Sequence, residues 1–125
     1  MKKILVVDDE PQVCAFMKEV LEGTGEYQVK VAHSVPDGLI QAKMLHPDAI
    51  TLDIVMPGFD GTSFVRLISK DPVLKKVPVL ILSAYIDDKS DVIEALRGKV
   101  VFDQLQKPFE IDMMLHKLSA LIVPQ

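Results

Sequence analysis

Five residues whose side chains could bind a metal ion and a phosphoryl group lie at the ends of short segments that could form strands. They are Asp8, Asp9, Asp53, Ser83 and Lys107. Three carboxylates held together repel one another, so at least one pKa is expected to rise unless a cation lies among them. Oxygen ligands of this kind favour Mg²⁺, which keeps several waters and shares its coordination sphere with phosphate oxygens. If the apolar runs are neighbouring strands, these residue types predict a magnesium and phosphoryl site.

The apolar runs alternate with segments of helical periodicity along the whole chain. A continuous aliphatic and β-branched run predicts a buried strand at 4–7, and further strands are predicted at 27–32, 49–52, 79–82 and 100–105. Apolar spacings of three and four predict helices between Pro11 and Gly23, over 37–45, from about 62 to 70, over 89–96 and from 111 to about 121. In the first helix, the residues at this spacing are Val13, Phe16, Met17, Val20 and Leu21.

Five strand-helix units in strict alternation predict an α/β fold with a parallel sheet and right-handed crossovers. Five units are too few to close an eight-stranded barrel, so an open, doubly wound (βα)5 sheet is expected. The 125 residues leave room for one domain, spanning 1–125. Ligands of such sheets bind beyond the carboxyl ends of the strands, where the five polar residues are expected to converge.

Composition argues against several classes of partner. The chain has 14 basic and 18 acidic residues, a net charge of −4, and no basic stripe, so direct nucleic-acid or membrane binding is not expected. No apolar stretch approaches the roughly 20 residues of a membrane span. The single cysteine, Cys14, cannot form an internal disulfide, which favours a reducing compartment and hence the cytoplasm.

Each polar residue, taken alone, fits a plainer structural role. One aspartate after a strand is more often a helix cap or turn former, and a lysine such as Lys107 is more often a solvated surface residue. The adjacent pair Asp8 and Asp9 has no obvious packing role, however, and the combination of all five residues favours a site. The remaining candidates carry less weight, because Cys14 is expected to pack in the core and the histidines lack metal-ligand spacing (His33, His46 and His116).

Four short motifs, in this order, make the chain resemble a receiver domain of the two-component response regulators, the CheY-like family. They lie at 4–11, at 47–61 around Asp53, at 82–84 and at 106–109. The resemblance covers essentially the whole chain and implies the flavodoxin-like strand order 2-1-3-4-5.

The resemblance implies a role for each acidic residue. Asp53 matches the phosphoacceptor, which attacks the phosphoryl group of a phosphohistidine. Asp9 and Asp53 would ligate Mg²⁺ directly, Asp8 through a water, and the backbone carbonyl of Val55 would supply a further oxygen. Mn²⁺ is an acceptable substitute. The metal would keep the acids ionised and neutralise charge on the transferring phosphoryl oxygens.

The resemblance also implies roles for residues after the fourth and fifth predicted strands. Lys107 would pair with the phosphoryl group as a point charge, and the Ser83 hydroxyl would donate a hydrogen bond to it. The small Ala84 leaves the approach to Asp53 open. Pro108 follows the lysine and implies a cis peptide bond, which is inexpensive before proline.

The chain departs from the family pattern at the conformational switch. The family places an aromatic residue three positions before the lysine, and this chain has Gln104 there. Either Phe102, two residues earlier on the same face of the strand, takes its place, or the segment 98–102 is shifted by an inserted residue.

Two positions are expected to set the lifetime of the phosphorylated form. Val55 and Tyr85 lie two residues after Asp53 and Ser83, where the family controls access of the hydrolytic water. A branched apolar side chain and a large ring predict slow loss of phosphate.

The expected partners are a histidine kinase or histidine phosphotransfer protein, and a target or output domain that contacts the fourth helix, fifth strand and fifth helix. Homodimerisation is a further option. The chain is expected to catalyse its own phosphotransfer and dephosphorylation without being a turnover enzyme. Two alternatives stay open, a phosphorylation-independent interaction domain and a magnesium-dependent phosphohydrolase, although Asp8-Asp9-Glu10 lacks the Asp-x-Asp pattern of the latter. The sequence does not identify the cognate kinase, the output or the full length of the protein.

Overall fold

The predicted alternation of strands and helices is present in the computed structural model, which describes residues 1–53, 61–83 and 91–122. Val55, Ala84 and Tyr85 therefore lie outside the described residues. The elements in chain order are β1 (Lys2–Val7), α1 (Pro11–Gly23), β2 (Tyr27–Ala32), α2 (Val35–Leu45), β3 (Ala49–Asp53), α3 (Gly61–Lys70), the 3₁₀ helix η1 (Leu74–Lys76), β4 (Val79–Ser83), α4 (Asp91–Leu96), β5 (Phe102–Gln106) and α5 (Ile111–Ile122).

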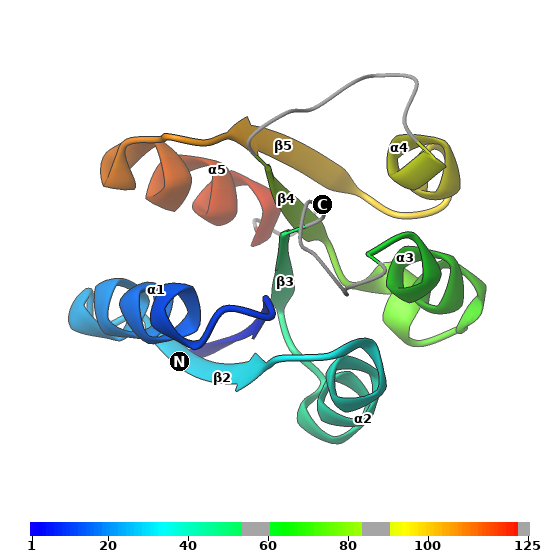
Figure 1. Ribbon diagram of the computed structural model, residues 1–125, viewed down its shortest axis with the longest axis horizontal. Coiled ribbons are helices and arrows are strands. Elements are labelled where there is room, and N and C mark those ends of the chain that lie inside the picture. Colours follow the sequence, from blue (N-terminus) through cyan, green and yellow to red (C-terminus); the bar gives the residue numbers. More distant parts are fainter. Residues whose placement is uncertain (54–60, 84–90, 123–125) are drawn as a thin grey trace.

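The five strands form one parallel sheet in the order β2-β1-β3-β4-β5, which confirms the flavodoxin-like order (Figure 1). Helices α1 and α5 cover one face, and α2, α3 and α4 cover the other (Figure 1). Each face buries its own apolar cluster, which explains why the central strands β1, β3 and β4 are buried along most of their length, whereas the edge strand β2 alternates between buried and exposed residues. The carboxyl ends of β1, β3, β4 and β5 consequently meet at one edge of the sheet, here called the carboxyl edge.

The strands extend further at this edge than the apolar pattern predicts. Asp53 is the last residue of β3 and Ser83 the last residue of β4, although both were expected to follow their strands. At the other end of the sheet, β5 begins at Phe102 and not at residue 100. Ladder hydrogen bonds depend on the backbone alone, so a polar residue can continue a strand beyond its apolar run.

Two helices also differ from the prediction. Helix α2 begins at Val35, two residues early, because the Ser34 side chain accepts a hydrogen bond from the Asp37 N–H at 3.2 Å and caps the helix. In α1, Phe16 was placed on the apolar spacing but is 48% exposed, and Cys14 is buried with Met17 and Leu21 instead. Phe16 directly precedes Met17, and successive residues on a helix point about 100° apart, so Phe16 falls at the margin of the buried face.

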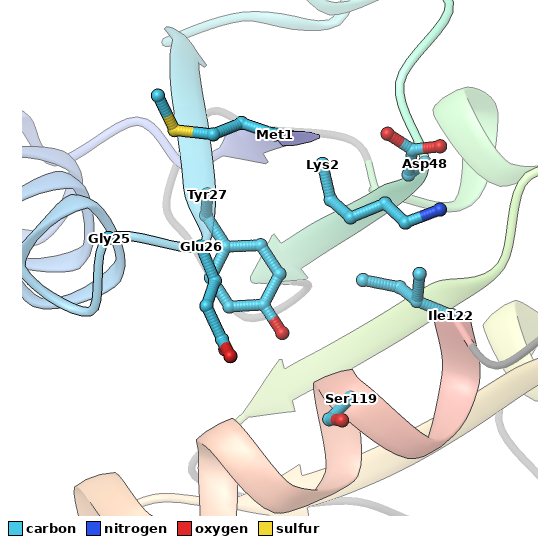
Figure 2. Close-up of a pocket in the computed structure, with 8 residues that line it drawn as sticks. All are labelled: Met1, Lys2, Gly25, Glu26, Tyr27, Asp48, Ser119 and Ile122. Carbon is cyan, nitrogen blue, oxygen red and sulfur yellow. The ribbon is translucent and has the colours of Figure 1, made fainter.

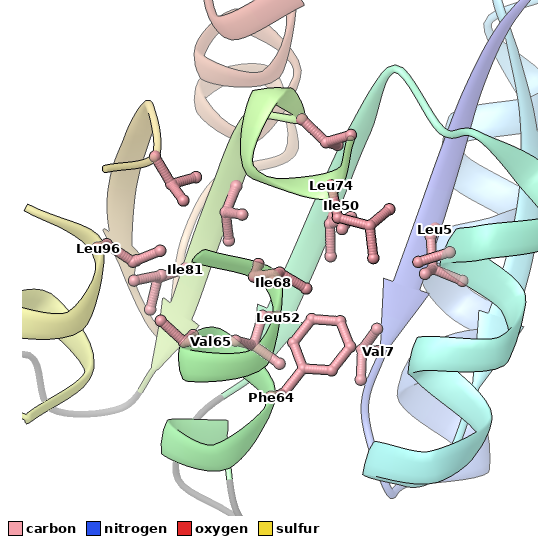
Figure 3. Close-up of a cluster of buried hydrophobic side chains, with 14 of the residues drawn as sticks. Leu5, Val7, Ile50, Leu52, Phe64, Val65, Ile68, Leu74, Ile81 and Leu96 are labelled. Carbon is pink, nitrogen blue, oxygen red and sulfur yellow. The ribbon is translucent and has the colours of Figure 1, made fainter. Parts of the chain in front are cut away.

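The packing of α2 on α3 depends on a close approach between Gly38 and Phe64. Phe64 is fully buried and lies beside Val7 of β1 (Figure 3). A Cβ atom added at Gly38 would lie 2.9 Å from the Phe64 Cε2 atom and 3.5 Å from Val7 Cγ1. The missing side chain at Gly38 therefore allows the Phe64 ring to fill the space between the two helices and the sheet.

Gly38→Ala is expected to lower the free energy of unfolding by about 1–2 kcal/mol, because overpacking against a buried ring outweighs the gain in helix propensity. Gly23→Ala is the matched control, since nothing lies within 4 Å of a Cβ atom there. Urea unfolding of both variants and of Gly38→Ala/Phe64→Leu tests the contact. Because leucine leaves more space than phenylalanine, Gly38→Ala should lower the free energy of unfolding less when residue 64 is leucine. If the effects of the two substitutions add exactly, the contact is contradicted.

Candidate functional site

Three of the predicted site residues interact at the carboxyl edge. Lys107 Nζ donates a hydrogen bond to Asp53 Oδ2 and forms an ion pair with it. The Asp53 side chain is 8% exposed and the Lys107 side chain 28% exposed, so the pair is largely withdrawn from water. Asp8 lies close enough to Asp53 and Lys107 to feel both charges. The geometry thus joins residues from the ends of β1, β3 and β5.

The neighbouring strand β4 holds the lysine segment in place. Ser83 ends β4 and is fully buried, and its backbone oxygen accepts a hydrogen bond from the Lys107 N–H at 2.7 Å. Ser83 also pairs with Gln106 in the sheet. The peptide bond between Lys107 and Pro108 is cis. Pairing of β5 with β4 therefore continues as far as the lysine that contacts Asp53.

Asp8 is an acid whose surroundings disfavour its ionised form. It is 2% exposed, and burial raises its pKa. The Glu10 N–H donates a hydrogen bond to Asp8 Oδ1 at 2.9 Å, which lowers the pKa of Asp8. The negative charge of Asp53 raises this pKa, and the positive charge of Lys107 lowers it. A net upward pKa shift means that the surroundings of Asp8 do not fully compensate its negative charge.

A divalent cation would supply the missing compensation. Asp9 follows Asp8 and is partly buried, so carboxylates from β1 and β3 are available as ligands. In the parts of the chain that the structure describes, no group of three or more His, Cys, Asp or Glu side chains is arranged so that it could hold a metal ion. Magnesium is usually bound through one or two carboxylates, waters and phosphate oxygens, so this donor set fits a magnesium ion shared with a phosphoryl group.

Cys14 and His33 make contacts that the sequence did not predict. Cys14 Sγ donates to the Asp8 backbone oxygen at 3.4 Å, and His33 Nδ1 lies 3.2 Å from the same oxygen. The two side chains are 3.6 Å apart. They lie on α1 and just after β2, and together they hold the main chain of Asp8 at the end of β1. No spacing of residues in the sequence predicts this contact, because it depends on how α1 packs beside β2.

Burial raises the pKa of Cys14 to about 11, and the charges of Asp8 and Asp9 contribute. The folded pKa exceeds the unfolded value of 9.0, so the stability from keeping the thiol neutral is full below pH 9 and is lost toward pH 11. Between about pH 8 and about pH 11, the free energy of unfolding of Cys14→Ala in urea should therefore fall by about 2 kcal/mol less than that of the parent chain. Parallel curves for the two proteins would contradict this assignment.

The switch position holds a buried polar atom. Gln104 pairs with Ile81, and among the described residues its Oε1 atom has no hydrogen-bond partner. Phe102 instead pairs with Val79, four residues before Ser83, which corresponds to about 13 Å along the strand. Gln104 is therefore the side chain nearer the carboxyl edge, and Phe102 lies toward the opposite edge.

A large hollow lies at the opposite edge of the sheet from these acids. Its volume is about 750 Å³, and its lining includes Lys2 and Tyr27, the first residues of β1 and β2 (Figure 2). Asp48 also borders it, and its carboxylate accepts a hydrogen bond from the Lys3 N–H at 2.7 Å. None of the predicted site residues lines this hollow, so it is separate from the carboxyl edge.

Comparison with known proteins agrees with this geometry. A family model described as response regulator receiver domain matches residues 4–119. Protein PilH of Pseudomonas aeruginosa is 33% identical over 122 residues, which cover 98% of each chain. Other curated relatives are longer, and the chain spans 26% to 50% of their length.

Solved structures show the same fold. The chemotaxis protein CheY4 of Vibrio cholerae matches with a TM-score of 0.84 and 27% identity, covering 97% of this chain and 98% of that one. The receiver domain of the sensor histidine kinase PA1611 of Pseudomonas aeruginosa matches with a TM-score of 0.80 and 26% identity, covering 97% of each chain. That receiver domain has a magnesium ion coordinated in its active site cleft. No helix among the described residues has the length and apolar character to span a membrane. The strand order, the acid-lysine edge and these matches together establish that the chain belongs to the family of response regulator receiver domains.

Proposed function

We propose that Asp53 is the phosphoacceptor of this receiver domain and takes its phosphoryl group from a phosphohistidine of a partner kinase or phosphotransfer protein. The observation that carries the proposal is the Asp53–Lys107 ion pair, which lies beside the buried Asp8 at the carboxyl edge. An Asp53 carboxylate oxygen forms a bond to phosphorus as the phosphorus–nitrogen bond breaks, and the electron pair returns to the imidazole. The product is an acyl phosphate.

The ligands of a magnesium ion would be Asp9, Asp53 and the Val55 backbone carbonyl, with Asp8 acting through a water. When bound, magnesium neutralises charge on the transferring phosphoryl oxygens. Asp8 and Asp9 hold the negative charge that attracts the ion, and the contacts of Cys14 and His33 fix the backbone that carries Asp8.

Lys107 and Ser83 then bind the product. Lys107 Nζ already contacts Asp53 Oδ2, so a small movement brings it to a phosphoryl oxygen, where it acts as a point charge. Ser83 ends the strand next to Asp53 and donates its hydroxyl hydrogen to another phosphoryl oxygen. Ala84 follows Ser83 in the sequence, and its small side chain is proposed to leave room for the donor.

Incubation of the purified chain with acetyl phosphate, with magnesium or with EDTA, tests the proposal. We expect one phosphoryl group per chain in the magnesium sample, cleaved by hydroxylamine as an acyl phosphate, and almost none in EDTA. Peptide mapping should place it on Asp53. A phosphoryl group on serine or histidine, or equal labelling without the metal, would overturn the proposal.

The lifetime of the acyl phosphate is a separate prediction. Val55 and Tyr85 are expected to hinder the hydrolytic water, so the phosphorylated chain should persist for minutes or longer at neutral pH. Tyr85→Gly should accelerate the loss on the order of tenfold, which corresponds to ~1.4 kcal/mol in the barrier. Loss from the parent chain within seconds would contradict the assignment of these two positions.

The downstream partner is proposed to contact the face of α4, β5 and α5, either as an output domain or as a second copy, and the lone cysteine favours a cytoplasmic setting. A second candidate function, phosphorylation-independent binding, is favoured by Gln104, whose polar atom occupies the place of the family's aromatic switch. If the partner of the α4, β5 and α5 face binds with identical affinity with and without acyl phosphate, that result would support the second candidate.

A further inference from the structure

Large apolar side chains gather on the outside of α2 and α3. Ile40 and Met44 of α2 are 56% and 75% exposed, Leu67 of α3 is 48% exposed, and Val73 just after α3 is 56% exposed. They account for four of the nine exposed large apolar residues in the described part of the chain. Leu67 and Val73 each line a hollow between the two helices, whereas Ile40 and Met44 line neither of these hollows. Exposed apolar side chains that border a hollow often mark an interaction site.

Two adjoining hollows lie between these helices. One has a volume of about 290 Å³ and is lined partly by Leu39 and Leu67, and the other has a volume of about 170 Å³ and is lined partly by Val73. Both hollows share Lys43, Asp71 and Leu74, so they form one surface, here called the α2–α3 groove. Leu74 is 2% exposed and closes the bottom of the groove.

The groove carries an excess of positive charge. Lys43 and Lys70 line it. Neither has an acid within salt-bridge distance among the described residues, although the Lys43 cation, after the N–H groups of Leu74 and Val73, contributes to lowering the pKa of Asp71. The single acid among the described lining residues is Asp71, whose Oδ1 accepts hydrogen bonds from the N–H groups of Val73 at 2.9 Å and Leu74 at 3.0 Å. Two lysines therefore outnumber one acid that is already hydrogen-bonded, on a chain whose net charge is −4.

We propose that the α2–α3 groove binds an amphipathic helix of a partner protein, with apolar side chains one turn apart in the two hollows and acidic side chains facing Lys43 and Lys70. An extended strand is disfavoured because the walls are helices and offer no open sheet edge.

The groove lies away from the phosphorylation site. Leu74 lies beyond the end of α3 opposite Phe64, whereas Phe64 and Val7 lie together at the other end of the core (Figure 3). Val7 is the last residue of β1 and directly precedes Asp8 at the carboxyl edge. A helix in the groove consequently leaves Asp53 open to a phosphodonor, and binding is expected with or without acyl phosphate.

The test uses two stapled helical peptides with leucine at positions i, i+3 and i+7, one flanked by glutamate and the other by lysine. By fluorescence anisotropy, the acidic peptide should bind with a Kd on the order of 10–100 μM, and the basic peptide at least about tenfold more weakly. Added salt should weaken the acidic complex. Methyl NMR should show shifts at Leu39 and Leu67, which line the groove, but not at Met113 on α5.

Variants decide between specific and nonspecific binding. Leu67→Gln should abolish binding, and Lys43→Glu/Lys70→Glu should reverse the preference toward the basic peptide. Phe16→Gln is the matched control, because Phe16 is equally exposed but lies on α1, so it should leave binding unchanged. Equal affinity for both peptides, shifts centred on α5, or a chain dimer in sedimentation equilibrium that Leu67→Gln dissociates would each overturn the proposal.

Discussion

Asp53→Asn will reduce phosphoryl incorporation from acetyl phosphate by at least about a thousandfold, the largest functional effect expected of any single change. The amide keeps the size of the side chain but removes the nucleophilic oxygen anion. It also removes one expected magnesium ligand charge and the negative partner of Lys107. Radiolabelled or mass-detected phosphate per chain measures the effect.

A control is needed because Asp53 is buried in the fold. Circular dichroism and urea unfolding should show that Asp53→Asn remains folded, since loss of an anion near Asp8 relieves repulsion. Asp48→Asn is a matched control, because Asp48 borders the hollow at the opposite edge of the sheet. Incorporation within threefold of the parent level in the Asp53 variant would exclude Asp53 as the acceptor.

Lys107→Met will lower the free energy of unfolding by about 2 kcal/mol in the absence of divalent ions. Removal of one partner of a buried pair leaves an uncompensated charge, which costs about 3–5 kcal/mol at full burial. The Lys107 side chain is 28% exposed, so the smaller figure applies. Methionine preserves the apolar stem, so the measured loss in urea reports the charge and not the packing.

Three further measurements separate charge from packing. Lys107→Met/Asp53→Asn should recover most of the lost stability, because neither charge of the pair remains. Magnesium should stabilise Lys107→Met more than the parent chain. The loss should also shrink as the pH falls through the raised pKa of Asp8, since protonation removes one of the repelling charges. If the loss of stability is the same in the double variant, with magnesium and at lower pH, it arises from packing alone.

The apolar runs and the helical spacings between them predicted an open parallel sheet with the polar residues at the carboxyl ends of its strands, and the resemblance to receiver domains predicted the strand order. Once the runs at 4–7 and 49–52 are recognised as parallel strands, Asp8 and Asp53 must lie at the same edge of the sheet. The structure confirms the strand order, and the contact between Lys107 and Asp53 follows from the adjacency of β5, β4 and β3. Chain topology does most of the positioning. The periodicity of the sequence predicts the alternation of strands and helices, and the family resemblance predicts the order of the strands.

Contacts that depend on side-chain packing were not predictable in the same way. The hydrogen bond from Cys14 to the Asp8 backbone needs the exact placement of α1 over β1, and the approach of Gly38 to Phe64 needs the separation of α2 and α3. Phe16 fits the helical spacing but lies outside the buried face. Periodicity specifies which side of a helix faces the sheet, whereas these contacts depend on distances of a few ångströms.

Magnesium-dependent binding of beryllofluoride, followed by ¹⁹F NMR, tests most directly whether Asp53 is a metal-assisted phosphoacceptor. Beryllofluoride bonds to a carboxylate oxygen and occupies the volume of a phosphoryl group, so it needs both the nucleophile and the compensating cations. With magnesium present, we predict ¹⁹F resonances of bound beryllofluoride that correspond to one beryllofluoride per chain. We predict no such resonances with EDTA or in Asp53→Asn. Bound resonances that survive either condition, or that never form in the parent chain, would contradict this role of Asp53.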